Sequence, residues 1–590
     1  MTAYNPPVRD LLFTMNEIGD LPGVLALPGN GEATPDLVET IVEEAGKFAA
    51  GELAPLNVIG DRQGNKWADG VVTTAPGVAA AYRDFVDNGW GALGANQDFG
   101  GQGMPHIVSL PVVELWASAN LAWSLCHMLT LGAVMAIENH ASQDLKAAYL
   151  PKMISGEWTG TMNLTEPQAG SDLAAIRARA VPDGDAYRIT GTKIFITWGE
   201  HDVAENIIHL VLARLPDAPP GVKGISLFIV PKFLVNEDGS LGARNDLVCS
   251  SIEHKLGIHG SPTAVMSFGD KDGATSYLVG EPNRGLEYMF TMMNHARINV
   301  GLQGVAIAER AYQQARDYAL DRVQTRPIGQ PAGATIVHHP DVRRMLLDMK
   351  ARIEAMRAMV YYVAGQMDVA HGASGAEAKK AAAIADLLTP VAKGWCTENG
   401  QIVTSEGIQV HGGVGFIEET GAAQHMRDAR ITTIYEGTTG IQANDLVGRK
   451  IARDKGETAK GFVAQMREIL PRLSGPLAPL AAGLAQGFDD LGRAIAFVLG
   501  KHESEPAVTA AGAVPLLNLF GVVTGGWLVA KSALAAQGRA AAEGDPTGFY
   551  GAKITLARHY ARHILPLTGA YFVAITEGSD TTLGFDVALL

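Results

Sequence analysis

The feature that most constrains this chain is a change of hydrophobic period along one sequence. Between residues 36 and 157 apolar side chains recur at spacings of three and four, which is the period of an amphipathic helix. From residue 187 to residue 279 short apolar runs alternate instead, and the helical period resumes at Gly285. This order predicts a small β domain between two helical regions.

The length and composition of the chain limit its class. At 590 residues it is too long for one core, which predicts three or four domains. Charged residues are 18% and hydrophobic ones 47%, as in a packed globular protein, and the net charge of -15 argues against general affinity for nucleic acid or anionic membranes. Cys126, Cys249 and Cys396 are far apart, so they predict neither a metal site nor a disulfide framework, and a reducing compartment fits.

The alternating region predicts a β-barrel or sandwich. Residues 187–190 and 193–198 alternate as the two strands of a hairpin would, with Gly191 and Thr192 as its turn. Further short strands are expected at 207–212, 225–230 and 264–268.

Two segments bear on location. The first 20 residues carry Arg9, Asp10, Glu17 and Asp20 among apolar residues, so we expect no secretory or transit signal and a cytoplasmic protein. The 25 residues from Pro506 to Ala530 contain no charge and are long enough to span a bilayer. Because prolines and a glycine pair interrupt this run, a buried helix pair is the preferred interpretation, with membrane contact as the alternative.

A carboxylate marks the first candidate site. Glu436 follows an apolar run and precedes a glycine-threonine loop, where the chain changes direction and can direct the carboxyl group into a pocket. Burial there would raise the pKa of Glu436 toward the range of a working proton acceptor. An ordinary glutamate in a surface turn is the alternative.

A second candidate site lies in Met162-Asn163-Leu164-Thr165-Glu166-Pro167-Gln168-Ala169-Gly170-Ser171-Asp172. This stretch is typical of a strand that enters a Pro-Gly turn, where small residues let backbone amides approach a ligand. Thr165 and Ser171 add neutral groups that can hydrogen-bond to a ligand. A polar hairpin loop is the alternative.

Together with residues 409–416 and 426–430, the stretch around Glu436 resembles the C-terminal signature of the acyl-CoA dehydrogenases. The resemblance extends over residues 40 to 450. It implies a mostly α fold with a central β domain: an N-terminal helical domain (1–160), a middle β-barrel (161–281), a C-terminal four-helix bundle (282–449) and an additional helical domain (450–590). It also implies that Glu436 takes the α proton of an acyl-CoA thioester while the β hydride goes to the flavin N5 of FAD.

The resemblance also implies which residues bind cofactor and substrate. The FAD contacts would be Met162, Leu164, Thr165, Gly170, Ser171, Phe195, Thr197, Arg322, Gln324, Gln409, Gly412, Gly413 and Thr438. The acyl-CoA contacts would be Ser171, Asn294, Arg297 and Gly437. Arg322 would meet the FAD pyrophosphate across a subunit interface, since Arg suits a bidentate phosphate contact. No metal is expected.

Three positions depart from the family pattern. Phe195 stands where many members carry Trp, Thr325-Arg326-Pro327 replaces a Phe-Gly pair, and Gly440 replaces Asn or Gln. A nicotinamide enzyme is disfavoured, because Glu418 stands where the third glycine of a Rossmann fingerprint should be.

The additional C-terminal residues resemble those of the larger family members. These residues carry 12 Lys plus Arg and 12 Asp plus Glu from Arg453 on, so no basic stripe for DNA is present. The resemblance implies a homodimer, electron-transfer flavoprotein as electron acceptor, and 3-methylmercaptopropionyl-CoA as one substrate, with medium- or long-chain acyl-CoA as the alternative. An acyl-CoA oxidase and a non-catalytic, nucleic-acid-binding flavoprotein are the rivals from other classes.

Overall fold

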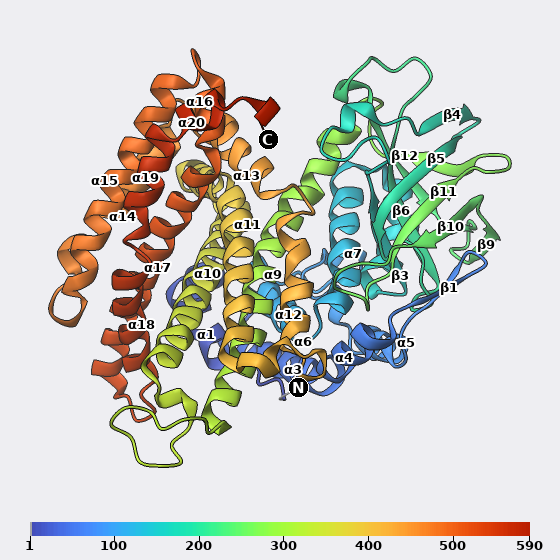
Figure 1. The fold of residues 1–590 in the computed structure, drawn as a ribbon. Helices are drawn as coiled ribbons and strands as arrows, with labels where there is room; N and C mark the ends of the chain where they lie inside the picture. Colours follow the sequence, from blue (N-terminus) through green and yellow to red (C-terminus); the bar gives the residue numbers. More distant parts are fainter. Residues whose placement is uncertain (1–2, 590) are drawn as a thin grey trace. The chain divides into compact units, whose positions relative to one another are not determined.

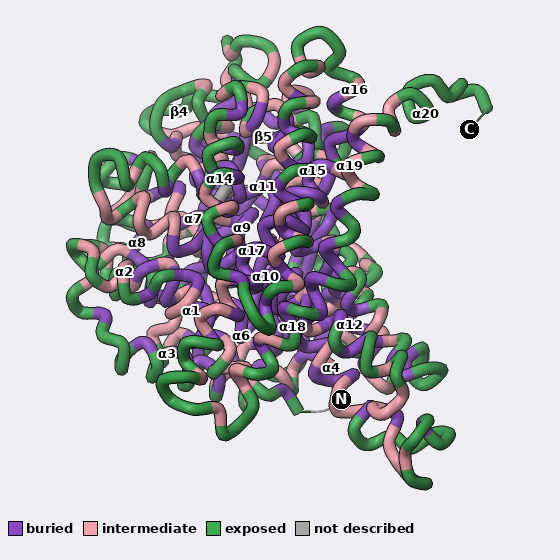
Figure 2. Tube along the Cα trace, turned by 90° about the vertical axis from the view of Figure 1, so that its left-hand side faces the viewer, coloured by how far each residue is buried: buried purple, intermediate pink, exposed green. Residues whose placement is uncertain are grey.

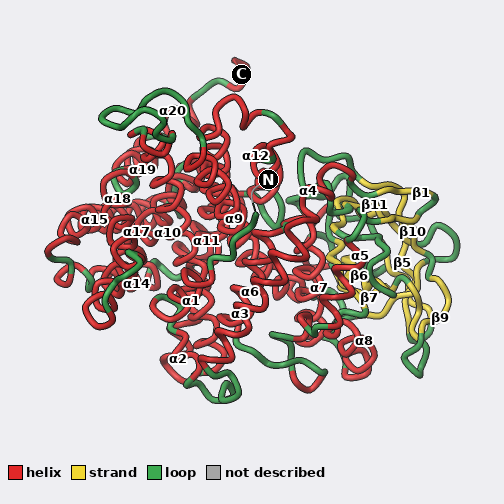
Figure 3. The backbone as a smooth tube through the Cα atoms, turned by 90° about the horizontal axis from the view of Figure 1, so that it is seen from below, coloured by secondary structure: helices red, strands yellow, loops and turns green. Residues whose placement is uncertain are grey.

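The computed structural model describes residues 3–589, apart from the side chain of Asn294, and divides into two compact units. The bundle unit comprises the chain up to Glu44, Pro105–Glu114 and the chain from Arg297 on; the sheet unit comprises Ala45–Met104 and Leu115–Ala296. Within the described residues every strand lies in the sheet unit (Figure 3). The predicted central β segment between helical segments is therefore confirmed.

The sheet unit contains one eight-stranded sheet in the order β10-β11-β5-β12-β7-β6-β3, with β4 paired beside β5. Its strands are β3 (Trp158–Asn163), β4 (Arg179–Asp183), β5 (Ala186–Thr197), β6 (Asn206–Ala213), β7 (Ser226–Pro231), β10 (Leu247–Ile252), β11 (Thr263–Phe268) and β12 (Ala274–Leu278). The pair of β3 and β6 is parallel, and the other pairings are antiparallel. Two small hairpins join β1 (Lys66–Ala68) to β2 (Val71–Thr73) and β8 (Phe233–Val235) to β9 (Leu241–Arg244).

The hairpin predicted around Gly191 is wrong, because β5 is one continuous strand. Its first half pairs with β4 and β12, and its second half pairs with β11. Gly191 serves close packing and not a turn: a Cβ there would lie 2.9 Å from the Cα of Ala178. A glycine inside an alternating run has both explanations, and only the packing distinguishes them.

The sheet unit also contains helices α4 (Ala54–Gln63), α5 (Val78–Asp87), α7 (Leu121–His140) and α8 (Gln143–Ser155). Of these, α7 and α8 pack against β3. Helix α7 begins where the Asn120 side chain accepts a hydrogen bond from the Trp123 backbone N–H at 3.0 Å. It packs closely on β3, since a Cβ on Gly160 would lie 2.5 Å from the Ala133 Cβ. This packing positions the chain segment that follows β3.

Long helices form the bundle unit (Figure 1). The extension is the additional C-terminal segment, residues 450–590. The helices that precede it are α1 (Val8–Glu17), α2 (Leu21–Leu25), α3 (Pro35–Phe48), α9 (Gly285–Asp321), α10 (Pro340–Gly372), α11 (Gly375–His411), α12 (Ala422–Ala429) and α13 (Thr439–Asp445). Part of α3, of α6 (His106–Ala119) and of α9 belongs to each unit. The extension contributes α14 (Glu457–Arg467), α15 (Ala478–Lys501), α16 (Pro506–Ala511), α17 (Ala513–Glu543), α18 (Phe549–His563), α19 (Leu567–Glu577) and α20 (Ser579–Gly584). Helices α10, α11 and α17 are buried over much of their length (Figure 2).

Small residues let the extension approach the bundle. Trp395 on α11 is almost completely buried, and Gly521 on α17 is the residue that makes room for it, because an added Cβ there would lie 2.2 Å from the indole. The uncharged run from residue 506 thus forms α16 and most of α17. Among the described residues α7 and α17 are long and apolar enough to cross a membrane, and 83% of each such stretch is buried inside the protein, as is typical of core helices.

Seven charged side chains form a largely buried ion-pair network in the bundle unit: Asp10, Glu114, Glu309, Lys350, Glu354, Arg357 and Lys553. Lys553 on α18 lies 2.5 Å from both Asp10 on α1 and Glu354 on α10. The network therefore joins the first helix of the chain, the central bundle and the C-terminal extension.

Candidate active site

Glu436 lies in a tight loop of the bundle unit, between a 3₁₀ turn (Arg430–Thr433) and helix α13. Its backbone φ is +54°, and that of Gly437 is +90°. A left-handed conformation is uncommon for a residue with a side chain and costs free energy, so surrounding contacts must hold it. The predicted change of chain direction at Glu436 is present.

Three side chains of the bundle unit hold this loop. Lys393 on α11 donates from Nζ to the carbonyl oxygen of Gly437 at 2.7 Å. Gln442 on α13 donates from Nε2 to the carbonyl oxygens of Glu436 and Gly437, at 3.3 and 3.2 Å. The Tyr435 hydroxyl donates to Gln303 on α9. Lys393 and Gln442 are fully buried, so water does not compete for these hydrogen bonds.

Burial raises the pKa of the Glu436 carboxyl group above its ordinary value, and the positive charges of Lys393 and Arg297 counter part of that rise. Burial likewise lowers the pKa of Lys393 to about 7, although the neighbouring Glu436 favours its charged form. A carboxylate whose pKa is raised toward neutrality is a better proton acceptor than an exposed one. The loop therefore has the chemistry of a general base.

The predicted substrate contact Arg297 is a buried residue of α9. Its Nη1 lies 3.1 Å from the Asp445 carboxylate, and both side chains are at most 4% exposed. The guanidinium is thus paired with a carboxylate of α13 within the bundle unit. Its role toward acyl-CoA stays a prediction, and the predicted Asn294 side chain lies outside the described residues.

The other predicted residues of the bundle unit lie at exposed positions. Arg322 and Gln324 follow the end of α9, where Arg322 Nη2 donates to Gln324 Oε1 at 3.2 Å. Gln409 is exposed near the end of α11. A Cβ on Gly412 or Gly413 would have no heavy atom within 4 Å, so their backbone is open to a ligand. Thr438 is partly exposed and begins α13 by accepting a hydrogen bond from the Ile441 backbone N–H.

The sheet unit holds the predicted loop after β3. Met162 is buried on β3, Leu164 and Thr165 are partly exposed, and Gly170 and Ser171 are exposed in the turn. The backbone N–H of Ile194 donates to the Thr165 carbonyl oxygen at 2.9 Å, which attaches this loop to β5.

A buried ion pair that the sequence analysis did not identify shapes the same loop. Lys193 on β5 donates from Nζ to Glu166 Oε1 at 2.9 Å and to the Leu164 carbonyl oxygen at 3.0 Å. Glu166 also accepts the backbone N–H groups of Arg177 and Ala178. The sequence did offer a signal for this pair. Lys193 interrupts the alternation of its strand and Glu166 lies in the Pro-Gly turn, and a buried charge requires a partner.

Phe195 has an unusual backbone in β5. Its φ is +60°, it lies where the register between β5 and β11 shifts, and it is 59% exposed. A bulge redirects a side chain, so the aromatic ring is presented at the surface of the sheet unit while Ile196 points into the core. Thr197, two residues later, is partly exposed. A strained, exposed aromatic residue is typical of a ligand contact.

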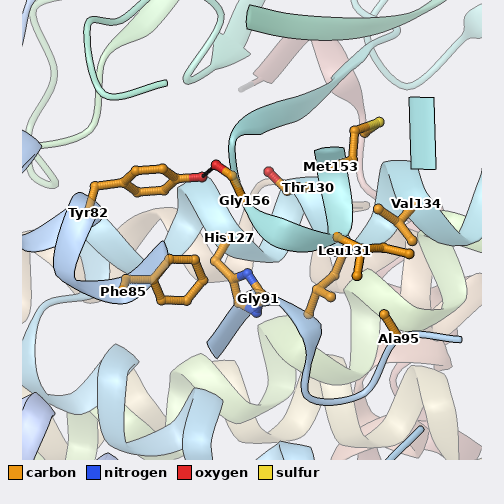
Figure 4. A pocket seen from close by; sticks show the side chains of 11 residues that line it. Tyr82, Phe85, Gly91, Ala95, His127, Thr130, Leu131, Val134, Met153 and Gly156 are labelled. Carbon is orange, nitrogen blue, oxygen red and sulfur yellow. Dashed lines mark hydrogen bonds between the residues drawn. The ribbon is translucent and has the colours of Figure 1, made fainter. Parts of the chain in front are cut away.

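One enclosed cavity in the sheet unit is too small for a substrate. It measures about 10 Å³ and is lined by Tyr82, Phe85, His127 and neighbouring residues (Figure 4). The Tyr82 hydroxyl donates to the Gly156 carbonyl oxygen beside it at 2.9 Å. That volume accommodates roughly one water molecule. The described residues also contain no group of three or more His, Cys, Asp or Glu that could hold a metal ion.

Four protein-family models match the chain, and together they cover most of it. Acyl-CoA dehydrogenase N-terminal, middle and C-terminal domains match residues 36–157, 161–270 and 283–451, and an acetyl-CoA dehydrogenase C-terminal-like domain matches residues 459–586. The chain belongs to the acyl-CoA dehydrogenase family. It is therefore an enzyme of a family whose members oxidise acyl-CoA thioesters with FAD.

Individual relatives agree with this assignment. The 3-methylmercaptopropionyl-CoA dehydrogenase of Ruegeria pomeroyi is 48% identical over 98% of this chain and 99% of its own. The structure of an acyl-CoA dehydrogenase complexed with FAD from Bacillus anthracis has the same fold, with a TM-score of 0.75 and 21% identity over 97% of this chain and 94% of its own. A third match is a chain from a structural study of the electron transferring flavoprotein of Acidaminococcus fermentans. It is 27% identical, with a TM-score of 0.58, over 70% of this chain and 97% of its own.

Proposed function

We propose that this acyl-CoA dehydrogenase converts a short acyl-CoA to its trans-2-enoyl-CoA, with Glu436 as the base that removes the α proton. The observation that carries the proposal is the Glu436 carboxyl group, whose pKa is raised by burial on a strained loop that buried donors hold. The 48% identical relative supports 3-methylmercaptopropionyl-CoA as the substrate. Medium- or long-chain acyl-CoA is the second candidate.

The protein has to stabilise the enolate as it forms, because the α proton of a thioester is too weakly acidic for a free carboxylate. In the proposed reaction the backbone N–H of Glu436 donates to the thioester oxygen, where negative charge develops. The proton goes to the Glu436 carboxylate, and the electron pair of the broken C–H bond forms the new double bond. Exclusion of water by the site would strengthen these interactions.

FAD is the cofactor that we propose for this chain, and the residues present fit it. The exposed Phe195 ring and the hydroxyls of Thr165 and Ser171 suit a flavin, while the open backbone of Gly412 and Gly413 suits a pyrophosphate. When bound, FAD supplies the acceptor for the hydride that leaves the β carbon. Absorbance of the purified protein after denaturation would quantify bound flavin.

The decisive experiment is anaerobic mixing of the purified flavoprotein with a panel of acyl-CoA thioesters that includes 3-methylmercaptopropionyl-CoA. Loss of flavin absorbance with short thioesters alone is the expected result, and bleaching by long thioesters alone would move the proposal to the second candidate. If every thioester left the flavin oxidised, the catalytic proposal would be wrong. Stoichiometric peroxide in air would favour an acyl-CoA oxidase.

We further propose a homodimer. Exposed apolar side chains occur near the predicted pyrophosphate residues of the bundle unit, with Ile328 at 88% and Phe416 at 82% exposure. Burying large apolar side chains against a second copy of the chain would be favourable. Sedimentation velocity should give twice the 62.2 kDa mass of the chain. Phe416→Asp should shift the protein toward monomer, whereas an unchanged mass would contradict this surface.

The proposed electron acceptor is electron-transfer flavoprotein, and the proposed location is the cytoplasm. The similar chain from the Acidaminococcus study supports the proposed electron acceptor, because that study concerns an electron transferring flavoprotein. Three buried free cysteines are compatible with a reducing compartment. Reoxidation of the reduced enzyme by purified electron-transfer flavoprotein, and fractionation of cells, would test the two proposals separately.

A further inference from the structure

Lys393 is a basic residue of α11 whose side chain is fully buried. Burial by itself does not explain why a basic residue occupies this position. The next residue of α11, Gly394, packs against Leu517 of the extension. Leaving an ammonium group in such surroundings costs free energy unless it makes specific interactions. The hydrogen bond that the structure records for Lys393 Nζ ends on the carbonyl oxygen of Gly437, the residue after the proposed base.

That contact acts on the backbone of the loop. Gly437 adopts a φ of +90° and directly follows Glu436 at +54°, so its carbonyl group is part of the strained turn. Gln442 donates to the same oxygen at 3.2 Å, as a neutral second donor. The chain thus contains a charged and an uncharged support for one atom.

The charges around Lys393 come from four neighbouring elements. Arg297 lies on α9, Glu398 on α11 itself, Glu436 on the loop and Asp445 on α13. Arg449 beyond α13 pairs with Asp445 at 2.6 Å, and Glu398 accepts a hydrogen bond from the Thr439 hydroxyl at 2.6 Å. Arg297 and Arg449 are therefore both paired with Asp445, whereas Lys393 donates its hydrogen bond to the Glu436–Gly437 turn.

We propose that Lys393 is a positioning residue for the base, which fixes the Glu436–Gly437 turn through the Gly437 carbonyl and sets the proton affinity of Glu436 through its charge. The inference rests on the proposed role of Glu436. A proton acceptor buried without a nearby cation would stay protonated at neutral pH, and one in direct contact with a cation would hold its proton too weakly. Lys393 lowers the pKa of Glu436 less than a direct ion pair would, because its Nζ donates to the Gly437 carbonyl oxygen and not to the Glu436 carboxylate.

The test compares Lys393→Met with Gln442→Met in the flavin-loaded enzyme. Each substitution removes one donor to the Gly437 carbonyl, but only Lys393→Met removes a positive charge. We expect Lys393→Met to shift the pH dependence of flavin reduction upward, because Glu436 then ionises at a higher pH, and to slow reduction at pH 7 by roughly tenfold or more. Gln442→Met should slow reduction without moving the pH profile.

An infrared titration adds a reading that does not depend on turnover. The band of the protonated Glu436 carboxyl group, assigned by its absence in Glu436→Gln, should persist to higher pH in Lys393→Met than in the wild type. Lys393→Arg, which keeps the charge, should restore the wild-type midpoint more fully than Lys393→Met. The same band midpoint in Lys393→Met and wild type would overturn the inference.

Folding and base identity are controlled separately. Flavin content and thermal unfolding identify a variant that no longer folds, and if Lys393→Met fails this check, Lys393→Gln, which removes the charge and keeps a polar group, carries the comparison of midpoints. If Glu436→Gln kept the wild-type rate of flavin reduction, the proposed base would be wrong whatever Lys393 does. If Glu436→Gln were inactive and Lys393→Met matched Gln442→Met in its pH profile, only the inference on Lys393 would fail.

Discussion

The bundle unit contains two clusters of buried charge with the same kinds of side chain. The pKa of Glu309 in the ion-pair network is shifted in the opposite direction to that of Glu436 in the loop, although burial also raises the pKa of the network residue Glu114. In the ion-pair network, burial alone would raise the pKa of Glu309, but Lys350 and Arg357 lower it to about 2. Around the loop, burial raises the pKa of Glu436 and lowers that of Lys393 to about 7.

The difference lies in contact geometry. Network cations touch carboxylates directly, as Lys553 does with Asp10 and Glu354 at 2.5 Å. Lys393 instead donates to a carbonyl oxygen, and Arg297 pairs with Asp445, so Glu436 feels their charge only through space. Direct pairing holds each charge in place and fastens helices together, whereas displaced charge leaves a carboxyl group whose pKa stays raised by burial.

Among substitutions in the two clusters, the largest expected effect is the loss of turnover in Glu436→Gln. Glu436→Gln keeps the shape of the side chain and removes its basicity, so flavin reduction by acyl-CoA should slow roughly 10²- to 10⁴-fold. Stopped-flow absorbance measures the rate, and flavin content together with tight binding of a thioester ligand serves as the control. A variant that reduced its flavin at the wild-type rate would rule out Glu436 as the base.

The next effect is on the stability of the network. Lys553→Met leaves Asp10 and Glu354 with less positive charge in a buried place, so the free energy of unfolding should fall by about 3 kcal/mol or more. Chemical denaturation measures the change. Lys501→Met, which removes a partly exposed cation from Glu505, should change stability little. Equal effects of the two substitutions would contradict the structural role of the network.

Acid should weaken the ion-pair network. The folded-state pKa of Glu309 is about 2, below the unfolded value near 4, so its contribution to stability is present above about pH 4 and is lost as pH falls through 2. Burial alone would raise the pKa of Asp10, but Lys350 and Lys553 hold it well below its ordinary value, so acid should weaken the Asp10 contacts as well. Thermal midpoints measured from pH 6 to pH 2 should fall less steeply for Glu309→Gln than for wild type.

The smallest expected effect is a gain in stability at the loop. Because the pKa of Glu436 is raised by folding, its contribution to stability is lost as pH rises above the unfolded value. Glu436→Gln should therefore have a slightly higher thermal midpoint than wild type at neutral pH, and the gain should vanish in acid. A lower midpoint at neutral pH would contradict the raised pKa.

Much of the fold was predictable because hydrophobic period is a local property of the chain. The switch from helical to alternating spacing located the β segment. The uncharged run forms a pair of helices, as predicted, but they separate near Gly512, only α17 is buried over much of its length, and the glycine pair lies inside continuous α17. The hairpin predicted at Gly191 was wrong, because a glycine between two alternating runs is equally consistent with a turn and with a close backbone contact. Only a neighbouring backbone, here that of Ala178, decides between the two.

The candidate site divides in the same way. By itself the sequence determined that Glu436 precedes a glycine at a change of direction, that small residues follow β3, and that the motifs resemble one enzyme family. Tertiary structure alone decided that Lys393, 43 residues before Glu436, supports its loop and that Lys193 neutralises Glu166. Buried charges are partnered through space, and the free energy of each depends on distances that no local pattern encodes.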